Sequence, residues 1–190
     1  MMKTLVEVKM KKLVPETELK RVQKFAVDLT LDPETAHHDL NLSGDRKQVN
    51  DTDVNRTQSF SSGRFYFEVQ VKGKTEWDLG VTRELSKRKG PITLCPQKGY
   101  WTIWLRNRNE YEALDDPPVL LSLRSRPQKV GVFVDYEEGL VSFYDVEAAA
   151  LIYSFTGCSF KKKLLPYFSP GLYNGGKNSA PLIISPVGVN

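Results

Sequence analysis

Three acidic residues, Asp135, Glu137 and Glu138, have the spacing of side chains that could act as paired catalytic carboxylates. Two carboxylates with different pKa values can serve as a general acid and a general base. Here they lie in the short polar segment Asp135–Gly139, and no partnered nucleophile accompanies them. We therefore expect them to shape a turn and to face water. The sequence also has no GxSxG or similar catalytic motif, so we predict that this chain is not an enzyme.

The remaining reactive residue types indicate neither a metal site nor a nucleotide site. Cys95 and Cys158 form no CxxC pair, and the two histidines, His37 and His38, lie far from both in the sequence. A zinc site is therefore not expected. The glycine-rich run at residues 174–177 lacks the Walker spacing and a following helix, which argues against a phosphate-binding loop. We expect no metal and no cofactor.

Two basic clusters, Lys87–Lys89 and Lys161–Lys163, could bind RNA or small phosphorylated ligands. The formal net charge of the chain is only +4 and its sequence pI is about 9.0. Such a mild excess permits contact with an anionic partner but does not require it. Solvated loops are the preferred interpretation of both clusters, and a sensor of RNA or phosphorylated ligands is the alternative.

The 190 residues suffice for one substantial domain, and a hydrophobic content of 40% with 26% charged residues is typical of a globular protein. The N-terminal residues lack the apolar region of a signal peptide, and no run is long enough to span a membrane. We expect a reduced cytosolic or nuclear setting, of which the cytoplasm is preferred, and no membrane partner.

The elements that must position any binding site are β-strands. Val130–Asp145 contains two alternating runs separated by a polar turn that ends in Gly139, which predicts an antiparallel hairpin. Shorter runs with the same alternation predict further strands at Phe25–Leu31, Asp39–Ser43, Arg64–Val71, Trp77–Thr82, Tyr100–Leu105, Tyr111–Leu114, Ile152–Phe155 and Leu182–Ile184. We expect Lys47–Asn55 to be an exposed loop and Leu165–Gly171 to be irregular. Many short strands separated by Gly and Pro turns predict an all-β sandwich.

Residues 1–24 are the only part of the chain with a helical pattern, and Pro15 interrupts it. This stretch is too short and too broken to form a stable helix on its own. It is either the end of a longer helical or coiled-coil segment or a docked or frayed N-terminal extension.

Several motifs, in the same order, resemble those of the PRY-SPRY domains of tripartite-motif ubiquitin ligases, particularly the expanded fish group. They are Val27–Pro33, Gly63–Val71, Trp77–Val81, Gly99–Leu105, Val134–Glu137 and Tyr167–Gly171. Butyrophilin intracellular domains are similar but more distant. Phe67 stands where the family usually has Trp. Between Val49 and Phe60 the chain is shorter than the family pattern, which suggests that one strand and one specificity loop are missing.

The resemblance implies a bent antiparallel β-sandwich of the concanavalin-like jelly-roll type, with the PRY part at about residues 25–59 and the SPRY part at about 60–187. It also implies a domain that binds proteins through loops at one edge. The RING finger that carries ligase activity is absent here, so the chain should recognise a target rather than transfer ubiquitin. Residues 1–24 would be a linker, and dimerisation would require an upstream coiled coil.

The same resemblance places six residues on the binding edge: Asp78, Trp104, Arg106, Leu172, Tyr173 and Asn174. Trp and Arg are enriched at the energetic centres of protein interfaces, where they bury large areas and offer a planar set of donors. The alternative for Trp104 is a core position. The alternative for Leu172–Asn174 is an ordinary turn before Gly175.

Overall fold

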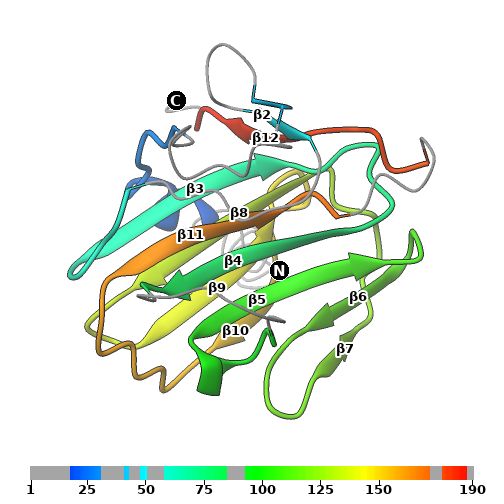
Figure 1. Ribbon diagram of the computed structural model, residues 1–190. Helices are drawn as coiled ribbons and strands as arrows, with labels where there is room; N and C mark the ends of the chain where they lie inside the picture. Colours follow the sequence, from blue (N-terminus) through cyan, green and yellow to red (C-terminus); the bar gives the residue numbers. More distant parts are fainter. Residues whose placement is uncertain are drawn as a thin grey trace, which may run out of the picture.

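Two antiparallel β-sheets pack face to face in the computed structural model, which describes residues 18–30, 41–42, 48–50, 58–84, 93–171 and 177–187 (Figure 1). The seven-stranded sheet has the order β1 (Asn41–Leu42), β2 (Gln48–Asn50), β12 (Leu182–Ser185), β3 (Arg64–Gln70), β8 (Lys129–Asp135), β9 (Leu140–Asp145) and β10 (Ala150–Phe155). The five-stranded sheet has the order β11 (Leu164–Ser169), β4 (Trp77–Arg83), β5 (Tyr100–Arg106), β6 (Glu110–Ala113) and β7 (Val119–Leu121). A short 3₁₀ helix, η1 (Pro96–Lys98), precedes β5. The predicted all-β sandwich is confirmed.

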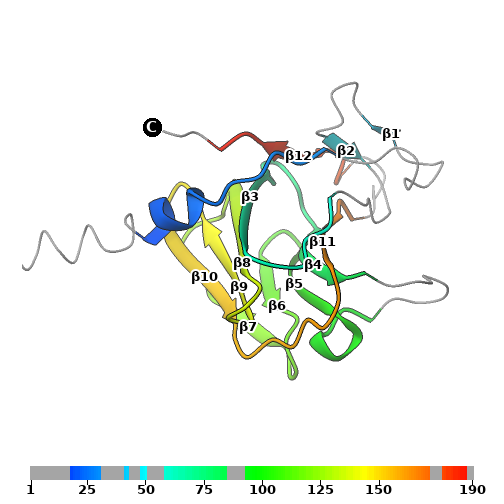
Figure 2. The ribbon, with the colours of Figure 1, turned by 90° about the vertical axis from the view of Figure 1, so that its left-hand side faces the viewer.

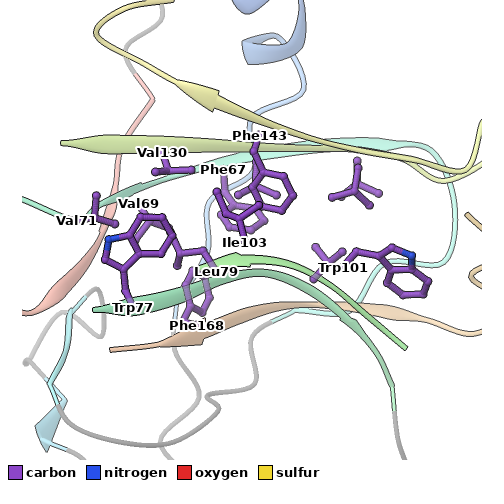
Figure 3. Packing of buried hydrophobic residues seen from close by; sticks show 14 of the residues in the cluster. Phe67, Val69, Val71, Trp77, Leu79, Trp101, Ile103, Val130, Phe143 and Phe168 are labelled. Carbon is purple, nitrogen blue, oxygen red and sulfur yellow. The ribbon is translucent and has the colours of Figure 1, made fainter. Parts of the chain in front are cut away.

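The core lies between the two sheets, because alternate side chains of each strand point inward. Trp77, Leu79 and Phe168 from the five-stranded sheet face Phe67, Val69 and Phe143 from the seven-stranded sheet (Figure 3). The rings of Phe67 and Phe168 meet edge to face, with their centroids 5.6 Å apart. Because inward positions are taken by large apolar residues, the intervening residues of β4 and β5 must point away from the core.

The predicted central hairpin is confirmed as β8 and β9, which pair from Val130↔Asp145 to Asp135↔Leu140. Its carboxylates do shape the turn: Asp135 accepts a hydrogen bond from the backbone N–H of Glu138, and Glu137 accepts one from Gly63 N–H. Asp135 does not face water, however. It is buried and forms an ion pair of 2.8 Å with Arg64, so the expectation of exposure was wrong for this residue.

A short helix at residues 18–23 covers the outer face of the seven-stranded sheet (Figure 2). Leu19 and Val22 are buried there in a second apolar cluster with three ring side chains of the sheet, Tyr66, Phe133 and Tyr144. The helix therefore has a docked apolar face, although it is too short to be stable by itself.

Three predicted segments differ from the structure. Within Lys47–Asn55, predicted to be a loop, residues 48–50 form β2, because Val49 pairs with Leu42 on one side and Leu182 on the other. Residues 25–30, predicted to be a strand, form only one bridge, Ala26↔Tyr66. Both this segment and β12 pair with the side of β3 that faces away from β8. Because β12 already pairs with residues 68–70 of β3, residues 25–30 can pair with only a short part of that strand.

The segment predicted to be irregular contains β11, which pairs with β4 along its whole length. Pro166 is compatible with this strand because of its orientation. Leu164, two residues earlier, exchanges its backbone hydrogen bonds with Phe60 and not with β4, so Pro166 also faces away from β4. A proline is tolerated where no ladder donor is needed. β11 is the edge strand of its sheet among the described residues, while residues 51–57, where the shortened segment lies, fall outside them.

Candidate functional site

One row of side chains crosses the outer face of the five-stranded sheet at the end where β4 begins and β5 finishes. The strand register places Ser169, Asp78, Trp104, Glu112 and Leu120 directly opposite one another across β11, β4, β5, β6 and β7. Side chains opposite each other on one face of a sheet are neighbours. This sheet lies in front of the seven-stranded sheet in Figure 1, where β4 begins and β5 ends on the right-hand side. We call these five residues and Arg106 the cross-strand site.

Arg106, the last residue of β5, holds the centre of the cross-strand site in place. Its Nη2 lies 2.7 Å from Oδ1 of Asp78, which makes the two side chains an ion pair. Its Nη1 donates hydrogen bonds to the backbone oxygens of Leu105 at 2.8 Å and Trp77 at 3.3 Å. The guanidinium carbon lies 4.1 Å from the centroid of the Trp104 ring, a cation–π contact.

Trp104 is half-buried on this outer face, whereas Trp77 and Trp101 are fully within the core. Its indole Nε1 donates a 3.0 Å hydrogen bond to Oε2 of Glu112. The ring is therefore fixed by Glu112 at its edge and by Arg106 over its face. A partly exposed, preorganised indole of this kind can bind an apolar partner surface with little loss of side-chain entropy. The alternative that Trp104 is a core residue does not fit this position.

Asp78 is one of the two carboxylate residues of the cross-strand site, and Glu112 is the other. Burial raises the pKa of its carboxyl above the ordinary value of 3.8, and the Arg106 guanidinium partly offsets that rise. The neighbouring Gly80 and Thr102 lie on the same outer face, where a Cβ on Gly80 would fall 2.1 Å from the backbone oxygen of Trp101. Glycine is thus required beside Asp78 for β4 and β5 to approach each other.

Leu172, Tyr173 and Asn174 lie outside the described residues, but both ends of their loop are described. Asn178, which is buried, accepts hydrogen bonds from the backbone N–H groups of Thr75 and Glu76 and donates one to Pro170 O. Gly171 has a φ of 75°, and a Cβ there would lie 2.7 Å from Cγ of Glu76. The two ends are therefore anchored next to the residues that lead into Asp78.

Four of these residues, Glu112, Leu120, Ser169 and Asn178, were not identified as site residues from the sequence. No motif indicates that Glu112 supports Trp104. This role could have been predicted only if the register between β5 and β6 had been known. Asn178 follows the glycine-rich run and looks like another loop residue until its contacts across the sandwich are known.

The site can bind through an indole face, a guanidinium and carboxylates, but it holds no catalytic constellation. Within the described ranges, no group of His, Cys, Asp and Glu could hold a metal ion. No helix in that part of the chain is long and apolar enough to cross a membrane. Lys161–Lys163 are exposed, and Lys87–Lys89 fall outside the described residues.

Comparison with known proteins identifies the family. The SPRY domain family matches residues 64–183, and the SPRY-associated PRY domain matches residues 29–76. Pyrin from Homo sapiens is 44% identical over 188 residues, which cover 90% of this chain and 24% of pyrin. Nuclear factor 7, brain, from Xenopus laevis is 46% identical over 171 residues, which cover 81% of this chain and 28% of that protein.

The E3 ubiquitin-protein ligase TRIM21 from Bos taurus is 41% identical over 186 residues, which cover 88% of this chain and 40% of the ligase. The chain thus spans between about a quarter and two fifths of the length of these relatives. The crystal structure of the TRIM65 PSpry domain superimposes with a TM-score of 0.72 at 21% identity, covering 88% of this chain and 95% of that domain. The chain belongs to the PRY-SPRY family, as a recognition domain of the kind found in tripartite-motif proteins.

Proposed function

We propose that this chain is the substrate-binding domain of a tripartite-motif ubiquitin ligase and that it binds its protein target at the cross-strand site. One observation carries the proposal: Trp104 is half-buried on the outer face of a sheet whose other two tryptophans are fully buried, and Arg106 and Glu112 hold its ring in place. Aromatic residues with arginine are the usual energetic centre of a protein interface.

The role as part of a ligase rests on the relatives. One of them is an E3 ubiquitin-protein ligase of which the matched residues cover 40%. A PRY-SPRY domain lacks the ligase machinery, so its contribution to such an enzyme is the choice of substrate. We place the chain in the cytoplasm and assign residues 1–24 to a linker. The protein would dimerise only if a coiled coil precedes this linker.

The loop that contains Leu172, Tyr173 and Asn174 forms the second part of the proposed binding surface. Support comes from its ends, which Asn178 and Gly171 anchor against Thr75 and Glu76, immediately before β4.

Affinity capture followed by quantitative proteomics tests the proposal. Wild-type chain is compared with Trp104→Ala and with Leu151→Ala, a control that removes another exposed apolar side chain, 50% exposed, on β10 of the other sheet. We expect Trp104→Ala to lose specific partners that Leu151→Ala retains, with both variants folded by circular dichroism. Equal capture by the two variants would overturn the assignment of the site, and an unfolded Trp104→Ala chain would show that Trp104 is needed for folding.

A further inference from the structure

A groove rich in arginine lies beside the cross-strand site. It is formed by the β5–β6 turn and the connection from β7 to β8, which lie on the same side of the molecule (Figure 1). Its volume is about 590 Å³, and Arg108, Glu110, Leu120, Arg124 and Arg126 line it with their neighbours. We call residues 108–111 and 120–126 the arginine groove.

The charges of the arginine groove are unbalanced. Arg108, Arg124 and Arg126 are all exposed, and none of them forms an ion pair with a carboxylate in the described part of the chain. Glu110 is the only carboxylate among the lining residues, and it accepts a hydrogen bond from Asn107. Tyr111 also lines the groove, and its buried hydroxyl has no hydrogen-bond partner among the described residues. The groove therefore carries three guanidinium groups and a single carboxylate.

Backbone contacts hold the two sides of the groove in place. The guanidinium of Arg126 donates to the backbone oxygen of Arg108, which joins the two connections directly. The N–H of Arg108 donates to Thr75 O at 3.0 Å, and the hydroxyl of Ser125 donates to Asp145 at 3.4 Å. A site fixed in this way loses less conformational entropy when it binds than a free loop does.

The groove continues the cross-strand site. Leu120 belongs to both, being 70% exposed and opposite Glu112 in the register, which in turn lies opposite Trp104. Arg108 follows Arg106 by two residues along the chain. One extended ligand can therefore contact the indole of Trp104 and the three arginines together.

We infer that the arginine groove binds an acidic segment of the protein target, an inference that rests on the proposed function. Arginine recognises carboxylates through paired hydrogen bonds. A protein segment fits better than a nucleic acid, because Leu120 offers an apolar contact and no exposed aromatic ring lines the groove for base stacking. β7 is also the edge strand of its sheet among the described residues, which suits an extended peptide.

Fluorescence anisotropy with three labelled probes tests this inference: a decamer of alternating glutamate and leucine, the same decamer with glutamine for glutamate, and a single-stranded thymidine decamer. The wild-type chain is compared with Arg124→Gln, with Arg124→Gln/Arg126→Gln, and with Lys162→Gln. The last variant removes one exposed positive charge from the connection between β10 and β11, which does not line the groove. We expect the glutamate decamer to bind best, about threefold more weakly in Arg124→Gln and about tenfold more weakly in the double variant, with Lys162→Gln unchanged.

Three results would overturn the inference: no binding of the glutamate decamer at low salt, equal binding by Arg124→Gln and Lys162→Gln, or tighter arginine-dependent binding of the thymidine decamer. Trp104→Ala separates this inference from the proposed function. If Trp104→Ala still captures every partner but the arginine variants lose the decamer, the proposed function is wrong and the inference that the groove binds acidic segments is supported. If the decamer does not bind while capture of partners depends on Trp104, the inference about the groove is wrong and the proposed function is supported.

Discussion

Nη2 of Arg106 lies 2.7 Å from Oδ1 of Asp78, in an ion pair that joins the end of β5 to the start of β4. The side chain of Asp78 is 11% exposed and that of Arg106 is 30% exposed. The carboxylate is therefore largely removed from water, whereas the guanidinium remains in contact with solvent. The same guanidinium stacks on Trp104. This one contact therefore links the electrostatics of the site to the position of its exposed ring.

A double-mutant cycle should detect this coupling. We expect Arg106→Gln to lower the free energy of unfolding by about 2 kcal/mol, because it leaves the Asp78 carboxylate buried without its partner. Asp78→Asn/Arg106→Gln should recover part of the loss, with a coupling energy of about 1–2 kcal/mol. Urea denaturation measures all four proteins. Strictly additive effects would show that the ion pair contributes nothing to stability.

Trp104 and Trp101 differ by three positions on one strand but face opposite ways. Trp101→Ala should destabilise the fold by about 3–5 kcal/mol, as expected for an aromatic residue removed from a core. Trp104→Ala should cost less than about 1.5 kcal/mol, since its ring is partly in water already. Chemical denaturation followed by circular dichroism checks both values. A larger loss for Trp104→Ala than for Trp101→Ala would contradict the assignment of the two faces.

The helix at residues 18–23 should contribute to stability through Leu19. Leu19→Ala is expected to lower the free energy of unfolding by about 2–3 kcal/mol, because Leu19 packs on the outer face of the seven-stranded sheet. The neighbouring Lys20 is exposed, so Lys20→Ala should change stability by less than about 0.5 kcal/mol. Thermal melts and binding of a hydrophobic dye compare the two variants. Identical melts would indicate that the helix does not dock in solution.

Lys74 should give the domain a pH dependence above neutrality. Its side chain is 2% exposed, its Nζ donates to Ala180 O at 2.7 Å, and burial lowers its pKa from 10.5 to about 8. Between these two values the unfolded chain binds a proton that the folded chain has lost, so stability must rise with pH.

We therefore expect the wild-type chain to gain up to about 3 kcal/mol of unfolding free energy between about pH 7.5 and about pH 10, relative to Lys74→Met. Taking the difference between the two proteins removes the contribution of tyrosines and other lysines that titrate in the same range. A difference that stays constant across the range, or that falls as pH rises, would show that Lys74 keeps its ordinary pKa in the folded state.

Alternation of side chains predicted the strands that form the core well, because burial on one face imposes a period of two. The hairpin of β8 and β9 followed from that rule. The rule put Trp101 and Trp104 on opposite faces of their strand, but the family resemblance was needed to assign Trp104 to the binding edge. The strands it missed depend on pairing partners far away in sequence: β2 needs Leu182, and β11 contains a proline whose orientation is set by Phe60. The residue types within a short segment do not indicate which distant strand the segment pairs with.

The candidate site was predicted in part for a similar reason. Asp78, Trp104 and Arg106 were named from the family resemblance, and the structure brings these three together. Their support by Glu112 and the anchoring of the neighbouring loop by Asn178 depend on strand register and on contacts across the sandwich. Whether the site binds a target stays a prediction, as does the part that Leu172, Tyr173 and Asn174 take in it.

Photo-crosslinking tests the central claim most directly. p-Benzoyl-phenylalanine is placed at Leu120, in the row that includes Trp104, or at Leu151, which is also exposed and apolar but lies on the other sheet. Irradiation in cell extract, followed by mass spectrometry, identifies what each position touches. We predict a discrete crosslinked partner at Leu120 that disappears when Trp104→Ala is added, and no such partner at Leu151. Crosslinking of the same partner from Leu151, or from Leu120 regardless of Trp104, would contradict the proposal that the cross-strand site is the target-binding surface.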